Sequence, residues 1–272
     1  MRREGRRLLT GFYARVGRSV LGFLAHAGGM ADLLRRTLYW TFVAPFRERT
    51  EHRRHVFPLM EAIGNKSFAI VALVAFLIGV ILVLQTGYLL EKYGQIRMVA
   101  GMVAAAMTRE LGPLMTAIVL VARVGAAFTA GLGTMTISEE VLALRIMSIN
   151  PVGYLVAPRF LAVLVMLPCL TVFANVVGMG GGCLMGMTYG LDPWAYVADS
   201  IAFLQVQDLL SGLAKAALFA VVICIVSCHM AFSVTGGPEG LARNTMLSVV
   251  TSLVLVIVTD GLFTALLKEF AG

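Results

Sequence analysis

The sequence predicts an all-α integral membrane protein of about five transmembrane helices, preceded by amphipathic helices that lie at the membrane surface. Two observations carry this prediction. First, 59% of the 272 residues are hydrophobic and only 14% are charged, whereas soluble domains are usually about a quarter charged. Second, the apolar residues gather in long charge-free blocks, such as residues 67–90 and 160–191. About 20 such residues cross the hydrocarbon core of a bilayer as a helix.

The N-terminal part of the chain is basic and amphipathic. Residues 1–66 contain 13 Lys and Arg against 5 Asp and Glu, and the rest of the chain carries a balance of −1. Within residues 8–46, apolar side chains recur at the spacing of helices that lie in the interface plane. We expect residues 1–55 to form this surface segment and residues 56–272 to form the membrane domain. Beside membrane spans, the basic charge favours anionic lipid over nucleic acid as the partner.

The apolar blocks place five spans at about 67–90, 111–134, within 159–188, 212–233 and 246–267. If the N-terminus is cytoplasmic, the inner segments hold 16 of the 22 Lys and Arg, and the outer ends hold four, including Lys215. Positive residues concentrate on the cytoplasmic side of membrane proteins. The N-terminus is therefore expected inside and the C-terminus outside.

Arg109 and Glu110 are two charges between apolar runs, just before Gly112 and Pro113. A single helix over 98–134 would be about 55 Å long, more than a bilayer requires, and a residue before proline avoids the helical region. We therefore predict a short helix over 98–108, a turn that contains the two charges, and a second span that starts at Pro113. Because lipid cannot satisfy the backbone at a turn, the turn should face protein or water.

Other residues inside the spans have structural interpretations. A buried arginine needs a carboxylate or carbonyl partner, so Arg123 is expected to form an ion pair, with Asp260 as the candidate. Five glycines within residues 178–186 predict tight helix packing. Cys224 and Cys228 share a helix face and are expected to pack as small residues rather than bind metal.

The loop after the second span predicts a short helix. Thr136 and Glu139 have the spacing of a capping box, and an apolar run with few charges follows. The helix could lie on lipid or dock a soluble partner. Its balanced charges, Glu139 and Glu140 against Arg145, favour docking, because helices that lie on lipid are usually rich in Lys and Arg.

The sequence contains no motif for catalysis. It has no G-x-x-x-x-G-K-[ST] loop for ATP, and neither H-E-x-x-H nor G-x-S-x-G. We therefore expect a chain without catalytic residues and without a metal site.

Three stretches together resemble the MlaE/YrbE family of ABC-transporter permeases: "RELGP" (109–113), "ARVGAAFTAGLGTM" (122–135) and "SEEVLALRIMSINPVGYLVAPR" (138–159). The resemblance covers about residues 55–270. It implies a homodimeric, non-catalytic, multi-pass permease of the inner membrane that moves phospholipids between the inner and outer membranes. It also implies separate ABC ATPase subunits, which bind the ATP so that this chain holds no cofactor, and a periplasmic ring of lipid-binding MCE-domain subunits.

The resemblance also implies two sets of site residues. The lipid-binding set comprises Leu82, Gln85, Leu89, Leu90, Tyr93, Arg109 and Glu110. The ATPase-coupling set, within 137–148, comprises Glu139, Glu140, Leu142, Leu144, Arg145 and Met147. Arg109 can contact a phosphate and Glu110 a headgroup amine, or the pair can simply hold the turn. The family often has glycine directly after the glutamine that corresponds to Gln85, but here Thr86 stands between Gln85 and Gly87. The resemblance therefore leaves the assignment of the pocket residues open by one position.

Two other functions fit a polytopic membrane protein. An ion-coupled secondary transporter of a hydrophobic solute would show inverted repeats with a broken helix in each half. The sequence predicts one break and an odd number of spans, which argues against two equal halves. A membrane scaffold without transport activity is the other alternative.

Overall fold

The computed structural model describes residues 24, 26–43 and 52–271, and side chains from residue 56 to 269 in the second range. These residues form helices and connecting segments without a β-strand. Of the predicted surface helices, the described part is a helix over residues 26–38 that continues as the π-helical segment η1 (Tyr39–Val43). The predicted helix from residue 8 lies outside the described residues, and the division at residue 55 stays a prediction.

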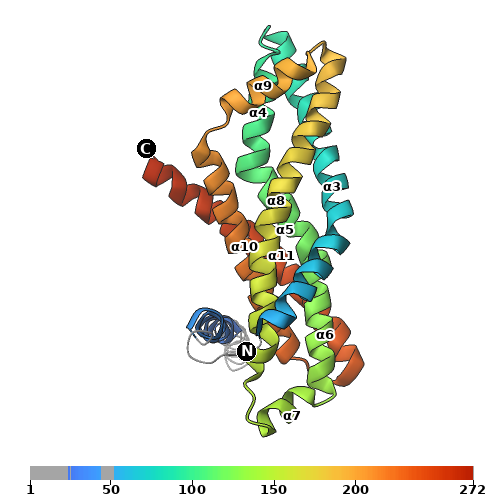
Figure 1. Ribbon diagram of the computed structural model, residues 1–272, viewed down its shortest axis with the longest axis vertical. Helices are drawn as coiled ribbons and strands as arrows, with labels where there is room; N and C mark the ends of the chain where they lie inside the picture. Colours follow the sequence, from blue (N-terminus) through green and yellow to red (C-terminus); the bar gives the residue numbers. More distant parts are fainter. Residues whose placement is uncertain (1–23, 25, 44–51, 272) are drawn as a thin grey trace, which may run out of the picture.

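Five helices in the described chain are long and apolar enough to cross a membrane, which confirms the predicted number of spans. Figure 1 shows them as an elongated bundle, with α7 at one end and α9 at the other. The first span is α3 (His52–Lys92), and the second comprises α4 (Met98–Ala106), η2 (Met107–Leu111), α5 (Gly112–Leu120), η3 (Val121–Gly125) and α6 (Ala126–Ile137). The third comprises η4 (Val152–Val156), α8 (Ala157–Gly186) and η5 (Met187–Tyr189), the fourth is α10 (Val206–Phe232), and the fifth is α11 (Gly237–Ala271). The short helix α7 (Glu140–Ile146) joins the second span to the third, and α9 (Pro193–Phe203) joins the third to the fourth.

Glycines let α3 and α8 approach each other closely, as the sequence predicted. A Cβ atom on Gly79 would overlap the carbonyl oxygen of Gly178, and a Cβ on Gly181 would overlap that of Phe76. The larger apolar core joins α3, α5, α8 and α10. It includes side chains such as Leu120 and Phe219, which are fully buried. Close backbone contact of this kind replaces the hydrophobic effect as the force that joins helices in lipid.

The second span is one continuous helix, so the predicted turn at Arg109 and Glu110 was wrong. Gly112 keeps right-handed helical angles (φ −59°, ψ −56°) although a proline follows it. The helix widens instead, and the N–H of Gly112 donates to the carbonyl of Met107 across the π-helical segment η2. A wider π turn accommodates Pro113, which has no N–H to donate. Residues 98–137 form a helix of about 60 Å, which therefore extends beyond the hydrocarbon instead of ending within it.

The predicted short helix after the second span forms as α7, but its predicted capping box does not. Thr136 still belongs to α6, where its hydroxyl donates to the carbonyl of Leu132 at 2.9 Å. Glu139 is the N-cap of α7 in a left-handed conformation (φ 61°), without a capping side-chain bond. Because α6 continues through Thr136, the chain reverses later, at Ser138 and Glu139.

Two predictions about charges inside the membrane also fail. Lys215 does not mark an outer end, because only 1% of its side chain is exposed and it lies inside α10. Arg123 is half-buried and forms no ion pair in the described part of the chain; Asp260, its predicted partner, contacts Lys215 at 2.9 Å instead. The predicted orientation stays a prediction, and it now depends on the remaining Lys and Arg.

Candidate functional site

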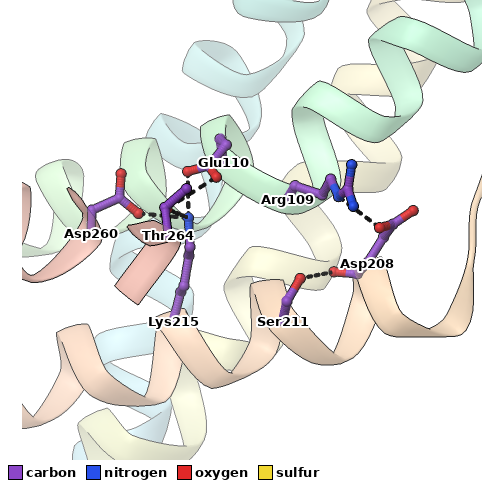
Figure 2. A network of polar contacts seen from close by, with 7 residues as sticks. All are labelled: Arg109, Glu110, Asp208, Ser211, Lys215, Asp260 and Thr264. Carbon is purple, nitrogen blue, oxygen red and sulfur yellow. Dashed lines mark hydrogen bonds and ion pairs between the residues drawn. The ribbon is translucent and has the colours of Figure 1, made fainter. Parts of the chain in front are cut away.

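The π-helical segment η2 presents Arg109 and Glu110 to two different helices. Figure 2 shows Arg109 directed at the start of α10 and Glu110 directed at Lys215 on α10 and Thr264 on α11. A turn at Arg109 and Glu110 was expected to face protein or water. A widened helix turn gives them two sets of partners without breaking the helix.

Arg109 pairs with Asp208 in the first turn of α10. Its Nε lies 2.7 Å from Asp208 Oδ1, and 6% of the Asp208 side chain is exposed against 60% of the Arg109 side chain. Asp208 also caps its helix, because the backbone N–H of Gln205 donates to its Oδ2 at 3.1 Å. Ser211 Oγ donates to the Asp208 carbonyl at 2.9 Å. The carboxylate is thus held firmly, while most of the arginine stays accessible.

Lys215 is the centre of the second group. Its Nζ contacts Glu110 Oε2 directly, lies 2.9 Å from Asp260 Oδ1, and donates to Thr264 Oγ1 at 2.7 Å. The Thr264 hydroxyl in turn donates to Glu110 Oε1 at 3.3 Å. A buried ammonium is costly unless it is paired and hydrogen-bonded, and this arrangement uses a carboxylate on each side. It joins the second span to the fourth and fifth.

Three residues of the site were not predicted from the sequence: Asp208, Lys215 and Thr264. A signal for two of them exists: Asp208 and Lys215 are seven residues apart in an otherwise apolar stretch, so they lie on the same face of a helix. That face is the one turned to η2. Because Lys215 was assigned to an outer end of the spans, its spacing from Asp208 was not recognised as a shared helix face.

The predicted lipid-binding residues of α3 lie apart from this cluster within the single chain. Leu82 and Leu90 are half-buried and pack against an apolar group that includes Val83 and Tyr196. Three others are exposed: Gln85 and Leu89 on the last turns of α3, and Tyr93 directly after its end. Arg109 and Glu110 make their polar contacts with α10 and α11. The chain therefore brings together the charged pair but not the whole predicted set.

The predicted coupling residues occupy the opposite end of the bundle, on and around α7. Five of the six are exposed: Glu139, Glu140, Leu142, Arg145 and Met147. Leu144 differs, because it is half-buried against the apolar core that includes Val141 and Phe160. Ile146 is missing from the predicted set although 77% of it is exposed. Thus α7 has an exposed apolar face, but Leu144 does not belong to it.

The cysteines of α10 lie in the core. Cys224 and Cys228 are fully buried with their Sγ atoms 4.0 Å apart, and both are free. They pack among apolar side chains, as predicted for small residues.

Comparison with known proteins agrees with this architecture. A family model described as Permease MlaE matches residues 56–266. The chain is 33% identical over 222 residues to a probable ABC transporter permease protein of Synechocystis, covering 81% of this chain and 84% of the relative. A probable ABC transporter permease protein of Rickettsia typhi is 35% identical over 206 residues, 75% of this chain and 80% of the relative.

A third relative extends over almost the full length. The intermembrane phospholipid transport system permease protein MlaE of Haemophilus influenzae is 28% identical over 268 residues, 96% of this chain and 98% of the relative. Together these matches confirm the resemblance that the motifs indicated. The chain belongs to the MlaE permease family and, with its five apolar spans, is a multi-pass protein of the inner membrane.

Proposed function

We propose that this chain is the membrane-spanning subunit of an ABC transporter that moves phospholipids between the inner and outer membranes. The family supports the permease role, and the name of the Haemophilus relative describes intermembrane phospholipid transport. The chain itself supplies no catalytic residue and no cofactor site in this proposal. ATP is bound and hydrolysed by separate ATPase subunits.

The proposed assembly contains two copies of this chain, cytoplasmic ATPase subunits and a periplasmic ring of MCE-domain subunits. In it, the N-terminus and α7 face the cytoplasm, and α9 and the C-terminus face the periplasm. A pocket between two copies would bring three exposed residues at the end of α3 to the charged cluster, which the single chain does not do: Gln85, Leu89 and Tyr93. The exposed side chains of Leu89 and Tyr93 suit contact with lipid tails.

The observation that carries the proposal is the charged cluster within an apolar bundle. A phospholipid needs an apolar path that contains polar groups for its headgroup. The side chains of Arg109 and Glu110 are 60% and 40% exposed, so consecutive residues of the second span supply one accessible cation and one accessible anion. The guanidinium can bind a phosphate with two parallel hydrogen bonds, and the carboxylate can accept from a headgroup amine.

The transport role is tested with the reconstituted complex of this chain and its ATPase. We expect ATP-dependent movement of a labelled phospholipid between donor and acceptor vesicles. Arg109→Gln should lower the rate about tenfold, the factor for loss of one hydrogen bond to a charged group. Movement that continues unchanged without ATP, or with an ion gradient as the only driving force, would favour a secondary transporter instead.

The docking role of α7 is tested by substitution at an exposed position. Ile146→Asp should abolish recovery of the ATPase with the affinity-purified permease, because a charge would enter an apolar interface. Leu144→Asp is less informative, since Leu144 is half-buried against the core and a charge there would also destabilise α7 itself. A matched control is Ile201→Asp on α9, where 68% of the side chain is exposed at the other end of the bundle. Equal ATPase recovery with both variants would exclude α7 as the docking site.

A further inference from the structure

The cluster around Lys215 contains more anions than cations. Arg109 and Asp208 form one pair of opposite charges. Lys215 is the single cation between two carboxylates, those of Glu110 and Asp260. The five groups therefore carry a formal charge of −1.

No other cation of the described chain balances this charge by direct contact. Lys268 lies one helical turn beyond Thr264 on α11, but it is exposed and forms no ion pair or hydrogen bond with the described residues. Charge in a membrane-spanning bundle is expensive unless it is paired. The surplus carboxylate therefore favours a cation that is not part of the chain.

The surplus is accessible at one place. Lys215 is buried with 1% of its side chain exposed, and Asp260 is 16% exposed. Glu110 is 40% exposed. An external cation can therefore reach the group through Glu110.

We infer that the site prefers phospholipids whose headgroup carries a primary ammonium next to the phosphate, as phosphoethanolamine does, over anionic headgroups that lack an ammonium. The inference rests on the proposed function, because it takes phospholipid as the substrate. The ammonium neutralises the surplus charge at Glu110 and donates hydrogen bonds to carboxylate oxygens. An anionic headgroup adds a further negative charge to a group that already contains one carboxylate more than it has cations.

The test measures which lipids the purified chain retains. The permease is reconstituted in nanodiscs of equimolar phosphatidylethanolamine and phosphatidylglycerol, released, and analysed by native mass spectrometry. We expect phosphatidylethanolamine to be enriched about fivefold over its share of the nanodisc, the factor for one partly exposed ion pair. Asp260→Asn keeps the size of the side chain and removes the surplus charge, so its enrichment should fall close to the nanodisc ratio.

Asp199→Asn is the matched control. Asp199 is half-buried on α9 and forms no ion pair with the described residues, so this variant should keep the wild-type enrichment. Bound lipids in the nanodisc ratio, enriched phosphatidylglycerol, or unchanged enrichment in Asp260→Asn would each overturn the inference while leaving phospholipid binding intact. If no phospholipid is retained at all, the proposed function itself fails.

A second measurement does not depend on the folding of a variant. Phosphatidylcholine keeps the positive charge of the headgroup but has no N–H to donate. In wild-type protein, replacing phosphatidylethanolamine by phosphatidylcholine should therefore lower the enrichment over phosphatidylglycerol. Equal enrichment of the two would contradict recognition of a primary ammonium.

Discussion

Two π-helical segments widen the second span, and each contains an arginine, but their surroundings differ. At η2, Arg109 pairs with Asp208, and its neighbour Glu110 pairs with Lys215. At η3, Arg123 is half-buried and forms no ion pair with the described residues. The same local distortion therefore occurs with and without a network of charges.

The difference comes from the residues that α10 and α11 place opposite each segment. Opposite η2 they supply charged side chains. Near η3 they supply hydroxyls, and Thr129 Oγ1 lies 2.8 Å from Ser248 Oγ and 3.1 Å from the carbonyl oxygen of Ser227. Small polar groups of this kind are sufficient to join helices in a membrane. The charges at η2 are thus more than packing requires, which is typical of a functional site.

The largest difference in stability is expected when one charge is removed at each segment. Lys215→Met leaves Glu110 and Asp260 without their shared cation, and we expect a loss of about 3–5 kcal/mol in the free energy of unfolding, as for other broken buried ion pairs. Arg123→Met removes a charge that has no ion-pair partner, so it should be neutral or stabilising. Unfolding titrations in mixed detergent micelles, followed by circular dichroism, measure both.

A Lys215→Met cost no greater than that of Arg123→Met would remove the distinction between the segments. The double variant Lys215→Met with Glu110→Gln sharpens the test. It removes one of the two carboxylates that Lys215→Met leaves without a cation, and should therefore recover part of the lost stability.

These two segments also show how far the sequence alone can lead. The spans and α7 were predictable, because length and apolar content determine a membrane helix and a run of apolar residues between Glu140 and Pro151 marks a short one. The π-helical segments were not. At η2, Pro113 indicates a break or a widened turn equally well, and η3 contains no proline that could mark it. The ion pairs depend on which faces of α10 and α11 turn toward η2, and only the packed helices define those faces. The spacing of Asp208 and Lys215 was the one local sign of them.

Each segment has a glycine at its C-terminal end: Gly112 directly follows η2, and Gly125 is the last residue of η3. A Cβ on Gly112 would overlap Asn175 Oδ1 and lie 2.7 Å from the carbonyl oxygen of Met107. A Cβ on Gly125 would meet its nearest atom, Ser227 Oγ, at 3.1 Å. Because overpacking typically costs about 1–3 kcal/mol, Gly112→Ala should lower stability by that amount. Gly125→Ala should change it little, since alanine's helix propensity, about 1 kcal/mol better, offsets a small adjustment.

The same unfolding titration compares these two variants. If Gly125→Ala proves the more damaging, the packing at η2 is looser than the contact between Gly112 and Asn175 implies. A transport assay adds a second readout, because a shift of η2 should displace Arg109 and Glu110 from their partners on α10 and α11.

The smallest expected effect concerns the hydroxyl contacts near η3. Thr129→Val keeps the shape of the side chain and removes the hydroxyl that lies among Gly125, Ser227 and Ser248. Hydrogen bonds between membrane helices contribute about 0.6 kcal/mol on average, so the variant should lose roughly that much stability and transport at the wild-type rate. Ser248→Ala in the same background should then cost little more, because its partner hydroxyl is already absent. A loss of stability comparable to that of Lys215→Met would mean that the hydroxyls near η3 join the spans as strongly as the charges at η2. The two segments would then differ in the kind of polar group that they contact, but not in how much those contacts stabilise the protein.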